Sequence, residues 1–321
     1  MRAYVTAGER RHMHTRWSVA VLALLVVGCS DDAGPTESTS RAVPPPVIPI
    51  SERVAFVSTR DGSRWIYVAD STGVRRLAPG DEPAWSPDGS TIAYETPDGV
   101  RLMSAAGTND RLFRRGGSQP SWSPDGTQIA FSDDGIRVMN ADGSSDRMVV
   151  ANDVIERGDH LQRPAWSTDG RRIAFVRHDC CWEEPSEIYV TSVDGARPQP
   201  IIFFQNGWTF SHWSPAWSPD GRSIAFIDNF ELATIGADGR DAKFLGIRAA
   251  WESGLDWSAD GGRIVFSDYT GKQSGPPFTG HLRVYEMVLA TGQVRQLIPD
   301  ASGAADPDYW DSYAVWSPAT R

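Results

Sequence analysis

Pro83-Ala84-Trp85-Ser86-Pro87-Asp88-Gly89 is the first copy of a short sequence that recurs along this 321-residue chain. Copies follow at residues 120–126, 164–170 and 215–221, with a looser copy at 255–261 and a truncated one at 314–318. The spacing is roughly 40 residues, which is the length of one four-stranded blade of a β-propeller. The recurrence therefore predicts an all-β propeller in which each copy marks the same place in a blade.

Each copy has the composition of a turn followed by strands. Serine, proline and glycine suit a tight turn, because proline presets φ and glycine accepts a positive φ. A β-branched and aromatic run follows, as at 91–94, and runs such as 136–139 and 294–297 supply a third and a fourth strand. One indole at a fixed place in each unit is typical of blade-to-blade packing rather than of a ligand-binding aromatic box. We therefore expect the repeat tryptophans in the core: Trp85, Trp122, Trp166, Trp217, Trp257 and Trp316.

The two ends of the repeat region are incomplete in complementary ways. Residues 53–57 read as a second strand with no Trp-Ser-Pro before it, and Trp316-Ser317-Pro318 is an inner strand with nothing after it. Together they make one whole blade, which leaves no unpaired strand edge. We predict six four-stranded blades, the last closed by the C-terminal inner strand joining the N-terminal three strands.

The full Pro-x-Trp-Ser-Pro-Asp-Gly-x-x-Ile-Ala-Phe pattern resembles the TolB-like β-propeller repeat and covers Ser51 to Arg321. The chain departs from TolB itself in lacking the separate α/β domain that precedes that propeller. It is also similar to the propellers of prolyl-oligopeptidase-type enzymes, but the sequence has no Gly-x-Ser-x-Gly nucleophile elbow. The resemblance is informative on the fold and poor on the function.

The first 28 residues read as a signal peptide rather than as part of the propeller. Arg10, Arg11 and Arg16 form a basic flank before an apolar run too short to span a bilayer. The run ends at Leu25-Val26-Val27-Gly28-Cys29, which resembles a bacterial lipobox and implies lipid attachment at Cys29. The alternative is an ordinary secretory signal followed by a chance cysteine. The sequence thus predicts a lipid-anchored protein of the bacterial cell envelope, periplasmic or surface-facing.

Residues 29–50 are rich in serine and threonine and end near three prolines, so we expect a disordered tether. Removal of residues 1–28 takes four arginines and one glutamate from 31 basic and 41 acidic residues. The formal charge then changes from −10 to −13. A surface this acidic argues against nucleic acid as a partner.

Cys180 and Cys181 are the remaining cysteines. Adjacent Cα atoms lie about 3.8 Å apart, closer than relaxed disulfides prefer, although an exported location favours oxidation. The sequence leaves open whether the pair forms a disulfide. The sequence lacks the spacing at which pairs of cysteines usually bind zinc, so a zinc site is not expected here.

Strand alternation places the Ser-Pro-Asp-Gly turns on one face, the short-turn face, and all long connections on the other, the long-loop face. The long connections are expected at 151–163, 177–185, 205–213, 247–254, 268–281 and 300–313. Long loops on one rim of a rigid scaffold often carry function. Their aromatic and acidic side chains predict a ligand-binding face, and about half of the rings are expected to pack within the loops. The candidate residues are Trp182, Glu183, Trp208, Phe210, Trp213, Trp251, Tyr309, Trp310 and Asp311.

Four histidines also fall in the expected loops, at His160, His178, His212 and His281. If they converged, they could bind a divalent metal, as the resemblance to TolB-like pectate-degrading lyases implies. No two of them share a ligand-like spacing, so we expect no cofactor. The sequence favours binding of a protein or peptide partner over catalysis. The alternatives are a metal-assisted carbohydrate-active enzyme and an envelope scaffold without a discrete pocket.

Overall fold

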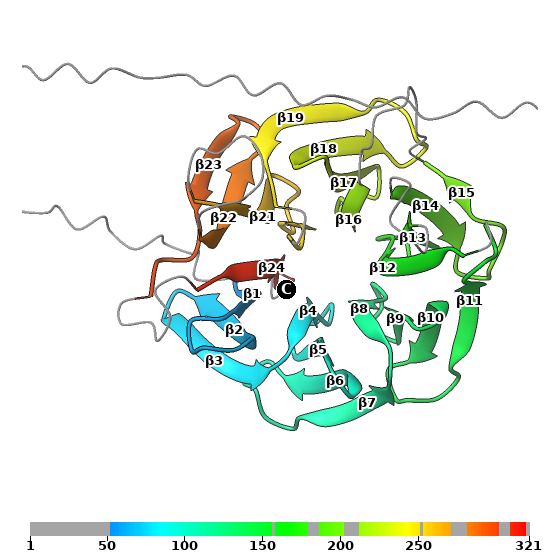
Figure 1. Cartoon of the computed structure of the whole chain (residues 1–321), viewed down its shortest axis with the longest axis horizontal. Coiled ribbons are helices and arrows are strands. Elements are labelled where there is room, and N and C mark those ends of the chain that lie inside the picture. The colour runs from blue at the N-terminus through cyan, green and yellow to red at the C-terminus, as the bar shows by residue number, and fades with distance from the viewer. Residues whose placement is uncertain are drawn as a thin grey trace, which may run out of the picture. The chain divides into compact units, whose positions relative to one another are not determined.

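The computed structural model describes residues 52–155, 158–178, 186–201, 212–250, 253–270, 281–301 and 309–318. Within these residues the chain forms six four-stranded antiparallel sheets, arranged as blades around a common centre (Figure 1). The predicted six-bladed all-β propeller is confirmed. Among the described residues, no helix is long and apolar enough to cross a membrane. The predicted signal peptide, Cys29 and the tether lie outside the described residues.

The blades follow one another along the chain, and each sheet runs from an inner strand at the channel to an outer strand at the circumference (Figure 1). Blade 1 consists of β24 (Asp311–Trp316), β1 (Val54–Ser58), β2 (Trp65–Asp70) and β3 (Gly73–Pro79). Blade 2 consists of β4 (Asp81–Trp85), β5 (Thr91–Thr96), β6 (Gly99–Ser104) and β7 (Arg111–Arg115). Blade 3 consists of β8 (Ser118–Trp122), β9 (Gln128–Ser132), β10 (Gly135–Asn140) and β11 (Arg147–Ala151).

The second half of the ring has the same order. Blade 4 consists of β12 (His160–Trp166), β13 (Arg172–His178), β14 (Glu187–Ser192) and β15 (Gln199–Pro200). Blade 5 consists of β16 (His212–Trp217), β17 (Ser223–Asp228), β18 (Glu231–Gly236) and β19 (Lys243–Arg248). Blade 6 consists of β20 (Asp256–Trp257), β21 (Arg263–Tyr269), β22 (Leu282–Val288) and β23 (Gln293–Gln296).

Blade 1 closes the ring as the sequence predicts. β24 pairs with β1 in antiparallel register, with Val54 opposite Trp316 and Ala55 opposite Val315. The backbone amide of Ser317 also donates to the Arg53 carbonyl over 2.7 Å. The chain ends are therefore joined inside one sheet, so the ring has no open edge at this point.

The repeated turn is held by a serine and an aspartate. In the first copy the Ser86 hydroxyl donates to Asp88 over 2.5 Å and accepts the backbone amide of Thr91 over 2.9 Å. Gly89 has a φ of 65°, which glycine adopts without strain. The same serine-to-aspartate bond recurs in the other four complete copies, at Ser123, Ser167, Ser218 and Ser258. Hydrogen bonds from the serines lower the pKa of the aspartates, as for Asp88 and Asp125.

The repeat tryptophans pack between neighbouring blades. Trp85, Trp166, Trp217 and Trp316 are buried, whereas Trp122 and Trp257 are partly exposed. The Trp217 indole donates to the Ala165 carbonyl of blade 4 over 3.1 Å, and Trp257 donates in the same way to Ala216 of blade 5. These two indoles join their own inner strands to the preceding ones, which confirms that the tryptophans serve packing.

Three inner strands begin earlier than the sequence analysis expects. The predicted loops run to Arg163, Trp213 and Tyr313, but β12, β16 and β24 begin at His160, His212 and Asp311. The physical reason is a β-bulge before each tryptophan, where the pairing register with the second strand shifts. Pairing resumes upstream of the bulge, so these loops are shorter than predicted.

Candidate functional site

Six residues, each three positions before a repeat tryptophan, line the central channel. They surround a cavity of about 380 Å³ and come from, or directly precede, the six inner strands: Glu82, Gln119, Arg163, Ser214, Gly254 and Tyr313. The five residues other than glycine have φ between 43° and 56°. Non-glycine residues rarely adopt this left-handed conformation, and it is concentrated at functional sites. We call these six residues the channel ring.

Arg163 links four blades across the channel ring. Its guanidinium lies 3.2 Å from the Glu82 carboxylate of blade 2 and donates to the Tyr313 hydroxyl of blade 1 over 3.3 Å. It also donates to the Ser214 hydroxyl of blade 5 over 3.2 Å. Burial alone would lower the pKa of Arg163, but Glu82 and Tyr313 raise it overall. The guanidinium is therefore permanently charged and held by several partners.

Gln119 extends the network toward a second carboxylate, that of Glu95. Its side-chain carbonyl accepts the Arg163 backbone amide over 2.9 Å, and its own backbone amide donates to Glu95 over 3.2 Å. Asp81, next to the ring, pairs with Arg64 at 2.6 Å. Burial raises the pKa of Asp81 to about 6, despite the favourable charge of Arg64. Burial and the charge of Glu82 raise the pKa of Glu95 to about 7.

The ring lies at the end of the channel where the inner strands begin, which is the long-loop face. It combines the Glu82 carboxylate, a guanidinium, an amide and two hydroxyl groups around one cavity. Asp81 and Glu95, whose pKa values are raised, accept the backbone amides of two ring residues, Glu82 and Gln119, so the ring and its cavity form a candidate binding site. The arrangement can recognise a polar group inserted along the channel axis.

Trp310 is the exposed aromatic residue at this face among the described candidates. Its side chain is 45% exposed, while its backbone amide and carbonyl bond to Thr59 over 2.8 and 3.0 Å. The indole is thus presented to solvent on a backbone that is held in place. This is the geometry expected of a docking residue.

Three other predicted face residues are buried and contribute to packing instead. Trp213 packs in the blade 5 core, and Tyr309 is covered by the guanidiniums of Arg60 and Arg283. Asp311 is fully buried and pairs with Arg60 at 3.0 Å. These three side chains are therefore turned into the fold and present no surface on the long-loop face. For the two rings, Trp213 and Tyr309, this agrees with the expectation that about half of the loop aromatics pack inward.

The remaining candidates for the face lie outside the described residues. They are Trp182, Glu183, Trp208, Phe210 and Trp251, together with the cysteine pair Cys180 and Cys181.

Two of the four histidines come together. His160 and His178 are opposite each other on β12 and β13, with ring centroids 5.5 Å apart. His212 begins β16, and His281 lies just before β22. The described parts of the chain contain no group of three or more histidine, cysteine or acidic side chains placed to hold a metal ion.

Sequence reasoning did not find the channel ring, although a signal was present. The residue three positions before the tryptophan differs in every copy, and it is charged or polar in most: Glu82, Gln119, Arg163, Ser214, Gly254 and Tyr313. A variable polar position inside an otherwise uniform inner strand indicates a channel-facing side chain. The signal is visible only when the copies are aligned with one another.

No family model and no curated protein matches this sequence. Solved structures do match in fold. TolB from Acinetobacter baumannii superposes with a TM-score of 0.65 and 18% identity, covering 84% of this chain and 67% of that one. The oligogalacturonate lyase from Vibrio parahaemolyticus gives a TM-score of 0.54 at 12% identity, covering 78% and 75%. A gluconolactonase from Xanthomonas campestris gives 0.54 at 16% identity, covering 80% and 86%.

The fold defines the chain as a six-bladed β-propeller. Within that class its fold is TolB-like, as the superposition with TolB shows. At these identities the likeness establishes the fold alone, and propellers of this shape include both TolB and enzymes.

Proposed function

We propose that this protein is a lipid-anchored, extracytoplasmic lipoprotein whose propeller binds a protein or peptide partner through the long-loop face. The observation that carries the binding proposal is the channel ring, where polar side chains of five blades converge on one cavity. The exposed indole of Trp310 supports the same face, because half-exposed tryptophans are frequent anchors of protein interfaces. The lipobox-like sequence ending at Cys29 supports the membrane anchor.

Capture of the partner tests which surface binds. Detergent-solubilised full-length protein would be immobilised and exposed to native envelope extract, and captured proteins would be identified by mass spectrometry. We expect Trp310→Ala to weaken capture at least about tenfold while leaving the unfolding temperature nearly unchanged, since its side chain is largely outside the core.

An aromatic residue on the ring circumference provides the matched control. Phe244 lies on the outer strand β19 and is 59% exposed. Phe244→Ala removes a comparable ring and should leave capture unchanged. Loss of capture in Phe244→Ala, with normal capture in Trp310→Ala, would contradict the assignment of the long-loop face.

A metal-assisted carbohydrate-active enzyme is the second candidate, favoured by the stacked pair His160 and His178. One structure of similar fold is an oligogalacturonate lyase in complex with manganese. Elemental analysis of purified protein tests this candidate. A stoichiometric divalent metal that His178→Ala removes would favour it over partner binding.

A further inference from the structure

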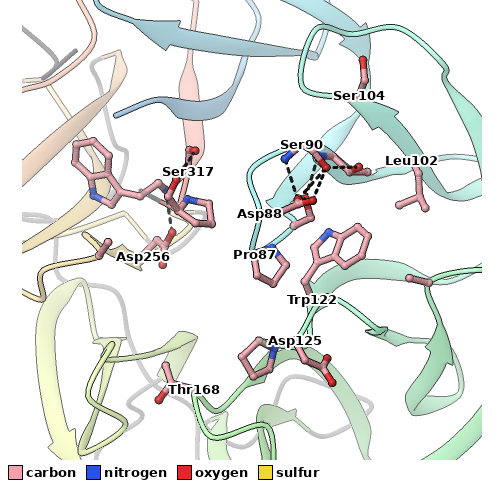
Figure 2. A pocket seen from close by; sticks show the side chains of 18 of the residues that line it. Pro87, Asp88, Ser90, Leu102, Ser104, Trp122, Asp125, Thr168, Asp256 and Ser317 are labelled. Atoms are coloured by element: carbon pink, nitrogen blue, oxygen red, sulfur yellow. Dashed lines mark hydrogen bonds between the residues drawn. The ribbon is translucent and has the colours of Figure 1, made fainter. Parts of the chain in front are cut away.

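A second cavity opens at the short-turn face, away from the channel ring. Its volume is about 1290 Å³, and its walls come from the Ser-Pro-Asp-Gly turns and the inner-strand tryptophans (Figure 2). It shares lining residues with the channel cavity, among them Asp256 and Trp122. A partner on the long-loop face would leave this cavity unused, and a ligand could bind in it whether or not that partner exists.

Asp256 is an exception within the repeat. It lies directly before Trp257, at the position that Ala84, Ser121, Ala165, Ala216 and Val315 occupy in the other five blades. Small or apolar side chains suit the tight contact between inner strands, and a carboxylate there has to be desolvated. Because only one of the six equivalent positions carries a charged side chain, we infer that Asp256 has a specific role.

The hydrogen bonds of Asp256 leave capacity for a ligand. One carboxylate oxygen accepts the Trp257 amide over 2.8 Å, and the other accepts the Trp316 amide over 2.9 Å. An ionised carboxylate can accept about four hydrogen bonds, so each oxygen has one site left. Asp256 forms no ion pair within the described parts of the chain, and Arg263, which covers the Trp316 ring, is held by Glu52 at 2.5 Å. Burial raises the pKa of Asp256 to about 7.

The fold itself shows how a guanidinium binds beside these tryptophans. The residue just before the second strand, or at its start, stacks on the tryptophan of the next blade when it is arginine. Arg53 covers Trp85 at 4.8 Å, Arg172 covers Trp217 at 4.6 Å, and Arg263 covers Trp316 at 5.0 Å. Such contacts are cation–π interactions.

Three indoles lack this cover, because Thr91, Gln128 and Ser223 take the arginine position beside Trp122, Trp166 and Trp257. Trp166 is nevertheless buried, so Trp122 and Trp257 are the uncovered indoles that solvent can reach. Both line the short-turn cavity. The short-turn cavity therefore presents aromatic faces that no arginine covers, together with a carboxylate for which the described residues supply no ion pair.

The wall of the short-turn cavity carries more negative than positive side chains. The lining includes the carboxylates of Asp88, Asp125 and Asp256 and the guanidinium of Arg111. Asp88 and Asp125 are engaged by hydrogen bonds within their own turns. Asp256 is thus the carboxylate in the described wall that is best able to bind an incoming donor.

We propose that the short-turn cavity binds a ligand carrying a guanidinium or ammonium group, which pairs with Asp256 and lies among the uncovered indoles. A guanidinium matches the paired oxygen sites of a carboxylate and stacks on aromatic rings, so arginine-like ligands fit best. The source is either a small cationic molecule or a basic peptide segment.

Calorimetric titration of the full-length protein in detergent tests the charge requirement. The probes are Nα-acetyl-arginine amide, its neutral isostere Nα-acetyl-citrulline amide, and a blocked tri-arginine peptide. We expect the arginine probe to bind at least about tenfold more tightly than the citrulline probe. Equal affinities, or no binding of either cationic probe, would overturn the proposal. Much tighter binding of tri-arginine would identify a peptide segment, and equal binding a small molecule.

Variants locate the site. Asp256→Ser should weaken binding of the arginine probe at least about tenfold, because the serine hydroxyl carries no charge but can still accept the Trp316 amide as Ser121 accepts that of Trp166. Asp256→Asn serves as the isosteric variant if the serine form unfolds. Thr91→Arg should cover Trp122 and weaken binding severalfold. Glu231→Gln, on β18 and outside the lining of both cavities, should bind as wild type; binding lost there and retained in both Asp256 variants would refute the assignment.

Discussion

At the residue scale, the aspartates of this propeller have opposite electrostatic environments. Those in the repeated turns, such as Asp125, accept hydrogen bonds from serine and backbone donors that lower their pKa. Asp256 has two backbone donors as well, but burial outweighs them and raises its pKa to about 7. The turn aspartates are ionised above about pH 5 in folded and unfolded chains alike, whereas Asp256 changes protonation on folding.

This difference predicts how stability depends on pH. Because the pKa of Asp256 is higher in the folded chain, its stabilising contribution is complete below the unfolded pKa of about 4 and is lost as pH rises through about 7. We expect Asp256→Ser to gain stability relative to wild type between about pH 5 and pH 8, on the order of 2 kcal/mol. Urea unfolding at about pH 5, 6.5 and 8 measures the difference.

A turn aspartate supplies the control for this experiment. Asp125→Asn should lose about 1 kcal/mol at every pH from about 5 to 8, because one turn hydrogen-bond acceptor is weakened and no titration falls in that window. Parallel stability curves for wild type and Asp256→Ser would show that Asp256 does not titrate as its burial implies.

Residues that follow the repeat could be predicted, and residues that depart from it could not. The repeat tryptophans and turn glycines are periodic, so their roles follow from the pattern. Asp256 and Arg163 are exceptions within the pattern, and their meaning depends on which side chains the ring brings within reach. Arg163 contacts Glu82 and Tyr313, which are 81 and 150 positions away in the sequence.

At the element scale, ring closure depends on a single short strand. β24 supplies the inner strand of blade 1, and its Trp316 is buried against blade 6. Asp311 at its start is buried with Arg60, which ties the strand to the chain just after β1. This pairing could be predicted because each chain end lacks what the other supplies. The bulge that extends the inner strands was not predicted, since nothing local marks where pairing resumes.

Deleting Ser312–Arg321 should open the ring. The deletion removes all but one residue of β24 and leaves β1 with an unpaired edge. Loss of the Trp316 side chain alone is expected to cost about 3–5 kcal/mol, so we expect the unfolding temperature to fall by at least about 10 °C. Differential scanning calorimetry and light scattering measure the melting and the aggregation. Deleting only residues 319–321 is the control, and equal melting of the two truncations would contradict closure by β24.

At the scale of the whole molecule, the two faces differ in chemistry. The long-loop face contains a guanidinium that is already paired within the channel ring, and it also carries the exposed Trp310. The short-turn face has a carboxylate with unused acceptor sites and two partly exposed indoles that no arginine covers. If both proposals hold, the propeller could engage a partner on one face while a cationic ligand occupies the other.

The last prediction tests whether Cys29 is the site of a lipid anchor. Cys29→Ser removes the thiol that a lipobox would acylate, so the variant should incorporate no labelled fatty acid and its propeller should leave the membrane fraction or remain as precursor. Its unfolding temperature should match wild type, because residue 29 precedes the propeller. Cys180→Ser tests whether any label depends on a different thiol. Membrane fractionation with undiminished label in Cys29→Ser would exclude the lipobox, and an N-terminal signal without acylation would then be the explanation to pursue.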